Sequence, residues 1–147
     1  MPRYLLDTNI LSELTKPRPS PEVVGWLRQQ ADDSLYISTW TLAELWRGIC
    51  RLPIGTKRQG LEDWFAGPVS PRQLFAGRVL AFDSAAALAW GELMAAAERD
   101  GRPRDRSDAI IAAVATANRC VVVTRNTRDF PGSEVLDPSQ ANVEKSA

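Results

Sequence analysis

Histidine is absent from all 147 residues, and this absence excludes more chemistry than any other feature of the composition. Without imidazole there is no Ser-His-Asp or Cys-His catalysis and no zinc site with imidazole ligands. The nine glycines are scattered and form no phosphate-binding loop. The two cysteines, Cys50 and Cys120, lack metal-ligand spacing, and we expect both to be small buried residues. Any chemistry must therefore come from carboxylates, hydroxyls, Lys, Arg or a bound metal ion.

Long hydrophobic runs are also missing. No apolar stretch approaches the roughly 20 residues that a membrane helix needs, and the charged Asp7 comes too early for a signal peptide. We therefore expect a cytoplasmic protein in a reducing compartment, with no membrane partner. Lysine is scarce, with 3 Lys against 15 Arg, and the net charge is zero. The arginines either serve phosphate contacts or reflect genome composition, and no overall field draws the chain to nucleic acid.

What is present is an alternation of short apolar runs and helical patterns. The predicted strands cover residues 4–6, 35–38, 79–82, 120–124 and, at an edge, 134–136, and the predicted helices cover about 9–16, 21–30, 39–51, 58–65, 84–99 and 107–117. This alternation predicts right-handed βαβ units and an α/β fold, namely a three-layer α/β/α sandwich with a central parallel sheet of four to five strands. The first strand is expected at its centre. We expect a single domain over residues 1–147, with its core at about 3–137 and a frayed tail at 138–147.

Connectivity brings acids from separate segments to one edge of this sheet. Asp7 ends the first strand, at the carboxyl edge where open parallel sheets hold ligands. Glu44 lies about one turn into the helix after the second strand, and Asp108 lies in the first turn of the helix before the fourth. The residues that follow the fourth strand at the same edge are Thr124, Asn126 and Asp129.

Such a cluster of carboxylates needs a proton or a cation. Two unit charges about 4 Å apart repel by about 4 kcal/mol at an effective dielectric of about 20. An all-oxygen ligand set favours Mg²⁺, with Mn²⁺ possible. Such an ion suits the hydrolysis of a phosphodiester.

Each acid also has a purely structural interpretation. Asp7 can cap the helix that follows it, and Glu44 can pair with Arg47 at i+3. Asp108 can favour a helix N-terminus, and Asp129 can cap a turn. We interpret Asp83 as the cap of the helix that follows it. We interpret Asp100 and Asp105 as loop charges.

Four segments of the chain resemble the signature blocks of PIN-domain proteins. They are residues 5–13 (LLDTNILSE), 41–45 (TLAEL), 107–113 (SDAIIAA) and 124–130 (TRNTRDF). Each block alone is weak evidence for the family. Four blocks in the right order and spacing, on matching strands and helices, are specific evidence for it. The resemblance spans about residues 3–136, and the group that the chain resembles most is the VapC toxins of bacterial type II toxin–antitoxin systems.

The resemblance implies a metal-dependent endoribonuclease toxin that cleaves structured RNA such as tRNA or rRNA. It implies that Asp7, Glu44 and Asp108 form an acidic triad around Mg²⁺ or Mn²⁺. Many relatives carry Asp where this chain has Asn126, so either Asn126 or Asp129 completes the site, and Asp129 is kept as a fourth catalytic candidate. The residues expected to support the site through hydrogen bonds are Thr8, Asn9 and Thr124.

The resemblance also implies partners. A cognate VapB-like antitoxin would block the acidic site, often with an arginine. Trp26, Trp40 and Trp46 either line an apolar groove for an antitoxin helix or belong to the core. We expect a homodimer, a toxin–antitoxin hetero-oligomer, and contact with operator DNA only through the antitoxin. The arginines near the predicted rim, some of which we expect to contact RNA phosphates, are Arg102, Arg104, Arg106, Arg125 and Arg128.

Two other functions remain open at this point. One is a PIN nuclease that acts on DNA or flap structures, although the chain lacks the insertions that such enzymes tend to carry. The other is a catalytically weak PIN scaffold that acts mainly through its antitoxin partner. The intact acid set opposes the scaffold, while Asn126 favours it. RNA cleavage assays with and without EDTA separate the three functions.

Overall fold

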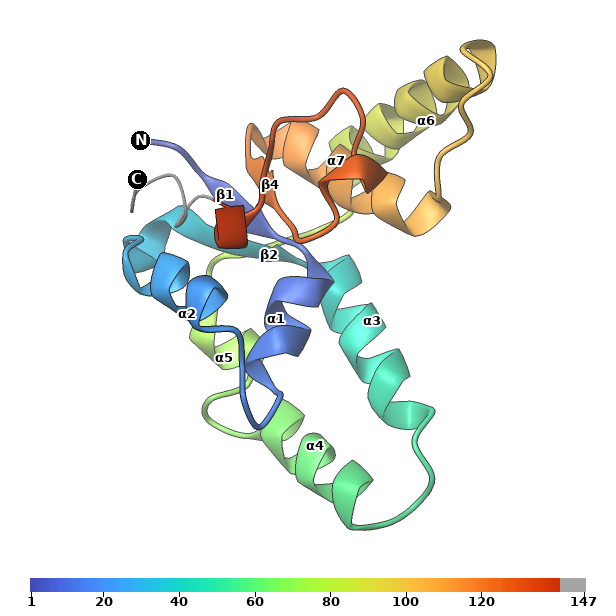
Figure 1. Ribbon diagram of the computed structural model, residues 1–147. Coiled ribbons are helices and arrows are strands. Elements are labelled where there is room, and N and C mark those ends of the chain that lie inside the picture. Colours follow the sequence, from blue (N-terminus) through green and yellow to red (C-terminus); the bar gives the residue numbers. More distant parts are fainter. Residues whose placement is uncertain (141–147) are drawn as a thin grey trace.

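Five parallel strands form the central sheet of the structure, a computed structural model in which residues 1–140 are described (Figure 1). The strands are β1 (Tyr4–Leu6), β2 (Leu35–Ser38), β3 (Val79–Leu80), β4 (Val121–Val123) and β5 (Val135–Leu136), in the order β3-β2-β1-β4-β5. The central strand is β1, whose Leu5 aligns with Tyr36 of β2 and Val122 of β4. The predicted parallel sheet, its central first strand and its edge strand at 134–136 are confirmed.

Seven α-helices and two short 3₁₀ helices connect these strands in residues 1–140. They are α1 (Thr8–Leu14), α2 (Pro21–Arg28), α3 (Thr39–Cys50), α4 (Thr56–Ala66), α5 (Pro71–Leu74), α6 (Ser84–Arg99), α7 (Arg106–Asn118), η1 (Asp32–Ser34) and η2 (Thr127–Asp129). Local sequence explains several starts. Ser20 precedes a proline at the first helical position, and the side chains of Ser38 and Asp83 accept hydrogen bonds from the backbone N–H of Thr41 and Ala86.

Helices cover both faces of the sheet, as a three-layer sandwich requires. In β1, Leu6 packs with Ile10, Val23 and other residues of α1 to α4, while Leu5 packs on the opposite face with Ile111 of α7. This alternation follows from the period of two along a strand. Figure 1 shows α1 to α5 on one side of the sheet and α6 with α7 on the other. The α/β fold class is confirmed.

Several local expectations were wrong. The third strand ends at Leu80 instead of residue 82. Cys50 is exposed, because it is the last residue of α3. The helical pattern over residues 84–99 predicts that Leu88 is buried, but Leu88 is 72% exposed, because α6 packs mainly on α7 and leaves its other face open.

The C-terminal segment continues past β5 with an ordered turn. Residues 138–140 are helical, Pro138 is buried, and the backbone N–H of Ser139 donates to Asp137 Oδ1 at 2.9 Å. The expectation of a frayed tail concerns mainly residues 141–147, which lie outside the described residues. Within residues 1–140, no helix combines the length and apolar character needed to cross a membrane.

Candidate active site

An open cavity of about 670 Å³ lies at the carboxyl edge of the sheet. Asp7, Glu44 and Asp108 all face it, so the structure brings together the three acids that connectivity predicted to meet. The other residues that line the cavity are Thr8, Asn9, Ser12, Glu13, Lys16, Arg125 and Asn126. The site thus draws on α1, α3, α7 and the loop after β4.

Asp7 is buried and held from two directions. Its Oδ1 accepts a hydrogen bond from the backbone N–H of Thr8 at 2.7 Å, and its Oδ2 accepts one from the hydroxyl of Thr124 at 2.9 Å. Asp7 is also the N-cap of α1, as its position before that helix predicted, so it has a structural role in addition to its place in the cavity. Burial raises the pKa of Asp7, the bonds from Thr124 and Thr8 oppose that rise, and the charges of Glu44 and Asp129 add to it.

A chain of hydroxyls holds Glu44. The hydroxyl of Thr8 donates to Glu44 Oε1 at 2.7 Å. Because that hydroxyl has one proton, Thr41 must donate in the 3.0 Å contact between the two threonine hydroxyls. Ser38 in turn donates to Thr41 at 3.4 Å. The i+3 pairing of Glu44 with Arg47 is not among the ion pairs formed by residues 1–140.

Asp108 lies in the first turn of α7, and its backbone N–H donates to Asp105 Oδ1 at 3.0 Å. Asp105 is therefore the N-cap of α7, and its interpretation as a loop charge was wrong. Burial raises the pKa of Asp108 to about 6, and the charges of Asp105, Asp129, Asp7 and Glu44 add to the rise. The acids of the cavity thus repel one another, as close carboxylates do in the absence of a counter-ion.

The chemistry of the cavity fits a hard divalent cation. Its acidic donors are all carboxylate oxygens, the ligands that Mg²⁺ and Mn²⁺ prefer. A cation would offset the repulsion that raises the pKa of Asp7 and Asp108. In the side-chain positions of residues 1–140, no three His, Cys, Asp or Glu residues stand ready to ligate one ion together. The acids therefore line one cavity and repel one another, but their side chains are not arranged as a complete metal-binding site.

The two candidates for the fourth corner occupy different places. Asn126 lines the acidic cavity, and its backbone N–H donates to the hydroxyl of Thr124 at 3.0 Å. Asp129 is exposed at the end of η2 and lines a neighbouring cavity with Arg128 and Asp137. Its charge still reaches the site, because it raises the pKa of both Asp7 and Asp108.

The predicted supporting residues form one network. The hydroxyl of Thr124 accepts hydrogen bonds from Asn9 Nδ2 at 3.1 Å and from the backbone N–H of Asn126, while it donates to Asp7. The backbone N–H of Arg125 donates to Asn9 Oδ1 at 3.4 Å. The loop after β4 is thereby tied to the first turn of α1.

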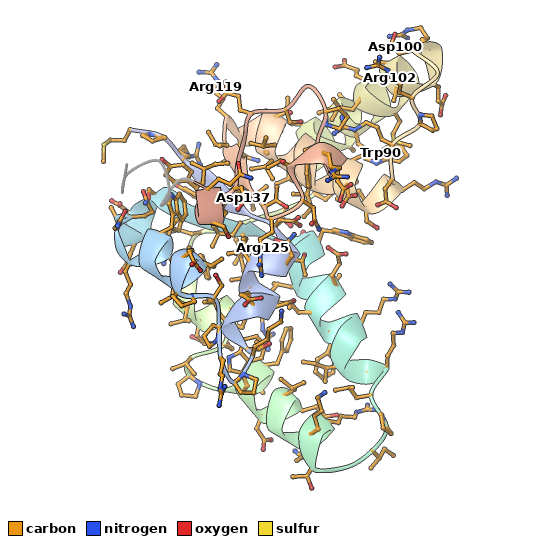
Figure 2. All side chains as sticks on the ribbon, in the orientation of Figure 1. Trp90, Asp100, Arg102, Arg119, Arg125 and Asp137 are labelled. Atoms are coloured by element: carbon orange, nitrogen blue, oxygen red, sulfur yellow. The ribbon has the colours of Figure 1, made fainter. Side chains whose placement is uncertain are left out.

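The predicted RNA-binding arginines are spread over the molecule. Arg125 lines the acidic cavity, whereas Arg128 lines the neighbouring one. Arg106 begins α7 and is exposed. Figure 2 shows Arg102 near the outer end of α6, well away from Arg125, which lies near the middle of the molecule beside α1.

Arg104 lies in the loop before α7 and is half-buried. Its Nε and Nη2 atoms are buried without a hydrogen-bond partner among the described residues. Burial lowers the pKa of Arg104, and the nearby charge of Asp108 opposes this change. Arg104 therefore lies within electrostatic reach of the acidic cavity without lining it.

Sequence reasoning did not identify four polar residues of the site. Thr41 supports Thr8 from α3, while Ser12, Glu13 and Lys16 line the cavity from α1 and the turn after it. Glu13 belongs to the block at 5–13, but its partners could not be read from the pattern. A charged residue in a seven-residue helix normally faces solvent, whereas Glu13 is only 5% exposed.

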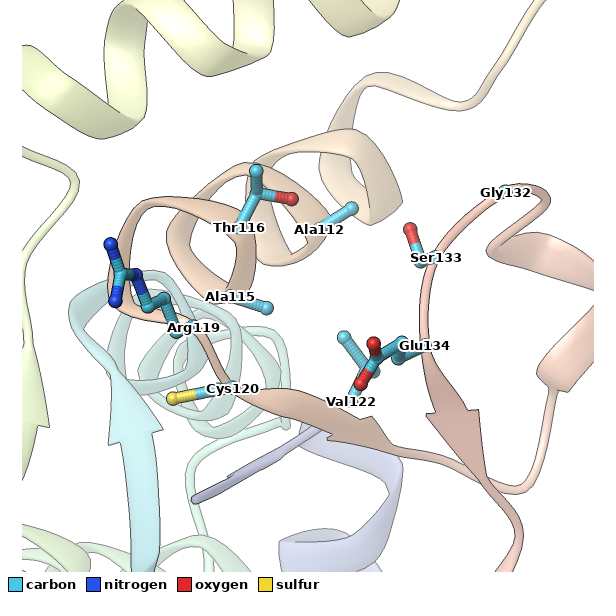
Figure 3. Close-up of a pocket in the computed structure, with 9 residues that line it drawn as sticks. All are labelled: Ala112, Ala115, Thr116, Arg119, Cys120, Val122, Gly132, Ser133 and Glu134. Atoms are coloured by element: carbon cyan, nitrogen blue, oxygen red, sulfur yellow. The ribbon is translucent and has the colours of Figure 1, made fainter. Parts of the chain in front are cut away.

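Another cavity, of about 340 Å³ and separate from both the acidic cavity and its neighbour, lies between α7, β4 and the segment before β5 (Figure 3). Among the residues that line it, Glu134 is the one carboxylate and Arg119 the one cation. Thr116, Ser133 and the small residues Ala112 and Ala115 complete much of the wall (Figure 3). With a single acid, this cavity lacks the carboxylate cluster that distinguishes the first one.

Comparisons with known proteins agree with this geometry. A family model described as PIN domain matches residues 4–131. The chain is 38% identical to VapC ribonuclease Y4jK of Sinorhizobium fredii, over 91% of this chain and 96% of that protein. Its structure is similar to FitAcB from Neisseria gonorrhoeae, with a TM-score of 0.84 and 34% identity over 92% of this chain and 97% of that one. It is also similar to DNA-bound VapBC from Salmonella typhimurium, with a TM-score of 0.72 and 28% identity over 94% and 99% of the two chains.

Proposed function

The chain belongs to the PIN-domain family, and on that premise we propose that it is a metal-dependent endoribonuclease toxin that hydrolyses RNA phosphodiesters. The observation that carries the proposal is the convergence of Asp7, Glu44 and Asp108 on one open cavity. The similarity to a VapC ribonuclease supports RNA as the substrate class. By the resemblance of the sequence blocks, tRNA or rRNA is the proposed target.

Asp7, Glu44 and Asp108 would hold Mg²⁺ or Mn²⁺, with Asn126 or Asp129 beside them. When bound, such an ion supplies Lewis-acid chemistry, because it draws negative charge from a phosphodiester and makes water a stronger nucleophile. The chain's own residues prepare the acids for this role. Thr124 and the Thr8 backbone N–H fix both oxygens of Asp7, and the Thr8 hydroxyl fixes one oxygen of Glu44.

The shape and charge of the cavity also support a polymeric anion as the substrate. The cavity is open, so a strand can pass along the edge of the sheet. Lys16 and Arg125 stand on the same wall as the acids and provide cations for phosphate oxygens. Phosphate contacts place a strand without reading its sequence, so the RNA target must be found by sequencing RNA ends after induction of the toxin.

Asp7→Asn and Asp108→Asn test the catalytic role of the acids. Each variant should lower RNA cleavage at least about 100-fold, because it removes a charge that the reaction needs. EDTA should abolish cleavage by the unmodified chain, and added Mg²⁺ or Mn²⁺ should restore it. The matched control is Asp63→Asn on α4, which lies outside the cavity and whose carboxylate accepts a hydrogen bond from Gln59 at 2.8 Å, and it should cleave normally. Undiminished cleavage by Asp108→Asn, or cleavage in EDTA, contradicts the proposal. Parallel assays on DNA and flap substrates test the alternative function, a PIN nuclease that acts on DNA.

We also propose a VapB-like antitoxin as the partner, in a hetero-oligomer that contains a homodimer of this chain and contacts operator DNA through the antitoxin, in the cytoplasm. A small apolar cavity between α1, α3 and α4 contains Leu45, Ile49, Leu61 and Trp64, and it shares Ser12 and Glu44 with the acidic cavity. An antitoxin helix on this face would therefore lie next to the acids. Of the three tryptophans predicted for such a groove, Trp26 is buried in the core, Trp40 is half-buried, and Trp46 is 43% exposed.

Trp46→Glu tests the docking face. Trp46 does not line this cavity, but its exposed indole lies against Phe65 of α4, with ring centroids 5.1 Å apart, and α4 also supplies Leu61 and Trp64 to the cavity. A carboxylate at position 46 therefore places charge beside the apolar cavity. Co-expression with the product of the adjacent short gene should give a complex with the unmodified chain and less complex with Trp46→Glu. The control is Leu88→Glu on the open face of α6, which should leave the complex intact.

A further inference from the structure

Glu13 is a buried carboxylate that the acidic triad does not use. Its Oε2 accepts hydrogen bonds from Lys16 Nζ at 2.7 Å and from Arg125 Nη1 at 2.9 Å. Its Oε1 accepts one from the backbone N–H of Ser20 at 2.9 Å. A buried carboxylate is unfavourable unless it is paired and hydrogen-bonded, and these three donors meet that need. Glu13 therefore joins α1, the turn after α1 and the loop after β4.

Arg125 is the distant partner in this cluster and is held at two points. Its guanidinium donates to Glu13, and its backbone N–H donates to Asn9 Oδ1. Asn9 in turn bonds Thr124, whose hydroxyl donates to Asp7. Figure 2 shows Arg125 beside α1, as these contacts require. The position of the guanidinium is thus coupled to the position of the first acid of the triad.

The cavity is lined by both acids and cations. Among the residues that line it, the cations are Lys16 and Arg125, and Glu13 contacts both. Counted over these three lining residues, two cations and one carboxylate give a net positive charge, and the charge of Arg125 also reaches Glu22, which does not line the cavity. One Arg125 nitrogen bonds Glu13, and a guanidinium has five N–H donors, enough to reach a phosphate as well.

We propose that Glu13 is a positioning residue that orients the Arg125 guanidinium, with Lys16 beside it, to bind a phosphate of the RNA strand next to the acidic triad. This inference rests on the proposed function, because it takes RNA as the substrate. A pre-oriented guanidinium loses little freedom when it binds a phosphate, so its contact is stronger than that of an untethered side chain.

The sign of the effect separates positioning from net charge. Glu13→Gln removes a negative charge from a wall that binds a polyanion, so charge alone predicts tighter RNA binding. Positioning predicts weaker binding, because Arg125 loses the carboxylate that aims it. A purely structural role predicts lower stability with no change in RNA affinity once the protein is folded.

The experiment measures binding of a short fluorescein-labelled single-stranded RNA by anisotropy across a KCl series. All variants are made in the full chain with Asp108→Asn, so that the RNA stays intact. Glu13→Gln and Arg125→Ala should each weaken binding about tenfold, and the double variant should bind no more weakly than Arg125→Ala. Each should also lower the slope of log K against log[KCl] by about 0.7, the value for one lost phosphate contact on a single strand.

The matched control is Glu62→Gln, which breaks the ion pair of Glu62 with Arg58 on α4, outside the cavity, and should leave RNA affinity unchanged. Equal or tighter binding by Glu13→Gln overturns the inference, and so do additive effects in the double variant. If Glu13→Gln fails to fold by circular dichroism, Arg125→Lys decides. It keeps the charge but not the planar fork that Glu13 holds, so it should weaken binding severalfold, and unchanged affinity overturns the inference.

Two controls separate this inference from the proposed function: RNA cleavage by the unmodified chain, and RNA binding by the chain that carries only Asp108→Asn. If the unmodified chain does not cleave RNA and the Asp108→Asn chain does not bind it, the proposed function is wrong and the inference falls with it. If cleavage and binding are both found, and Glu13→Gln in the Asp108→Asn background binds RNA as tightly as that background, the proposed function stands and only the role of Glu13 is wrong.

Discussion

The hydroxyl of Thr124 uses its full hydrogen-bonding capacity at the end of β4. It donates to Asp7 and accepts from Asn9 and from the Asn126 backbone, in a fully buried position. Thr124→Val keeps the shape and leaves these three groups without their partner. The free energy of unfolding in urea should fall by about 1–3 kcal/mol.

The control for this change is Thr127→Val, three residues further along the chain at the start of η2. Thr127 is exposed, so its replacement should stay within about 0.5 kcal/mol of the unmodified chain. If Thr124→Val unfolds at the same urea concentration as Thr127→Val, the network around Asp7 contributes nothing to stability.

The acids of the cavity weaken the fold when no cation is present. Burial and neighbouring carboxylates raise the pKa of Asp108 to about 6, so the native chain holds this proton more tightly than the unfolded chain does. The proton on Asp108 therefore stabilises the native chain at low pH. This stabilisation is lost as the pH rises from about 4, the ordinary pKa of Asp, through about 6, the pKa of Asp108 in the native chain. At pH 7 the ionised group lowers stability by about 1 kcal/mol once solvent screening is allowed for.

Asp108→Asn in EDTA tests this trade between stability and activity. At pH 7 the variant should unfold with a free energy about 1 kcal/mol higher, while RNA cleavage is lost. Its stability should also change less between pH 4 and pH 6 than that of the unmodified chain. A variant that is less stable than the unmodified chain at pH 7 would show that Asp108 makes favourable contacts that outweigh the repulsion.

Individual residues of the site differ in how far the sequence predicts them. Asp7, Glu44 and Asp108 follow from local position, because strand ends and first helical turns meet at one edge of a parallel sheet. Glu13 does not, because the guanidinium that meets it lies 112 residues further along the chain. Such a pairing depends on side-chain reach across the assembled sheet, which periodicity does not encode.

Helix α7 begins at a capping residue that bears on the site. Asp105 accepts a hydrogen bond from the backbone N–H of Asp108, which is three residues further along the chain and is itself one of the acids of the cavity. Asp105→Ala should lower the free energy of unfolding by about 1 kcal/mol, measured in urea. Asp105→Asn keeps an acceptor at the cap and should unfold within a few tenths of a kcal/mol of the unmodified chain. Equal losses in the two variants would show that charge, and not capping, is what Asp105 contributes.

The elements that sequence predicts best are those with both a cap and a long periodic face. The bounds of α6 are those expected, because Asp83 caps it and an Ala-rich run follows. Ser70 and Pro71 repeat the signal of Ser20 and Pro21, yet only a four-residue helix forms before Phe75 packs into the core. β3 is also shorter than its apolar run, because Ala81 and Phe82 are exposed at the edge of the sheet.

At the scale of the whole molecule, the sheet order was predictable only in part. The alternation of strands and helices indicates parallel pairing, and the apolar β4 indicates a strand covered on both faces. The placement of β2 and β4 on either side of β1 depends on which helix covers which face. Leu6 and Leu5 decide this by packing with α1 to α4 and with α7, respectively.

The central position of β1 has a consequence for the time at which the site forms. The backbone N–H of Asp7 bonds the carbonyl of Val123, and Thr124 is 117 residues away from the Asp7 that it holds. A nascent chain on the ribosome therefore carries Asp7 and Glu44 long before α7 and β4 have been translated. The acidic cavity is complete only after β4 and Thr124 have been synthesised, so a product that ends before α7 lacks both Asp108 and the hydroxyl that anchors Asp7.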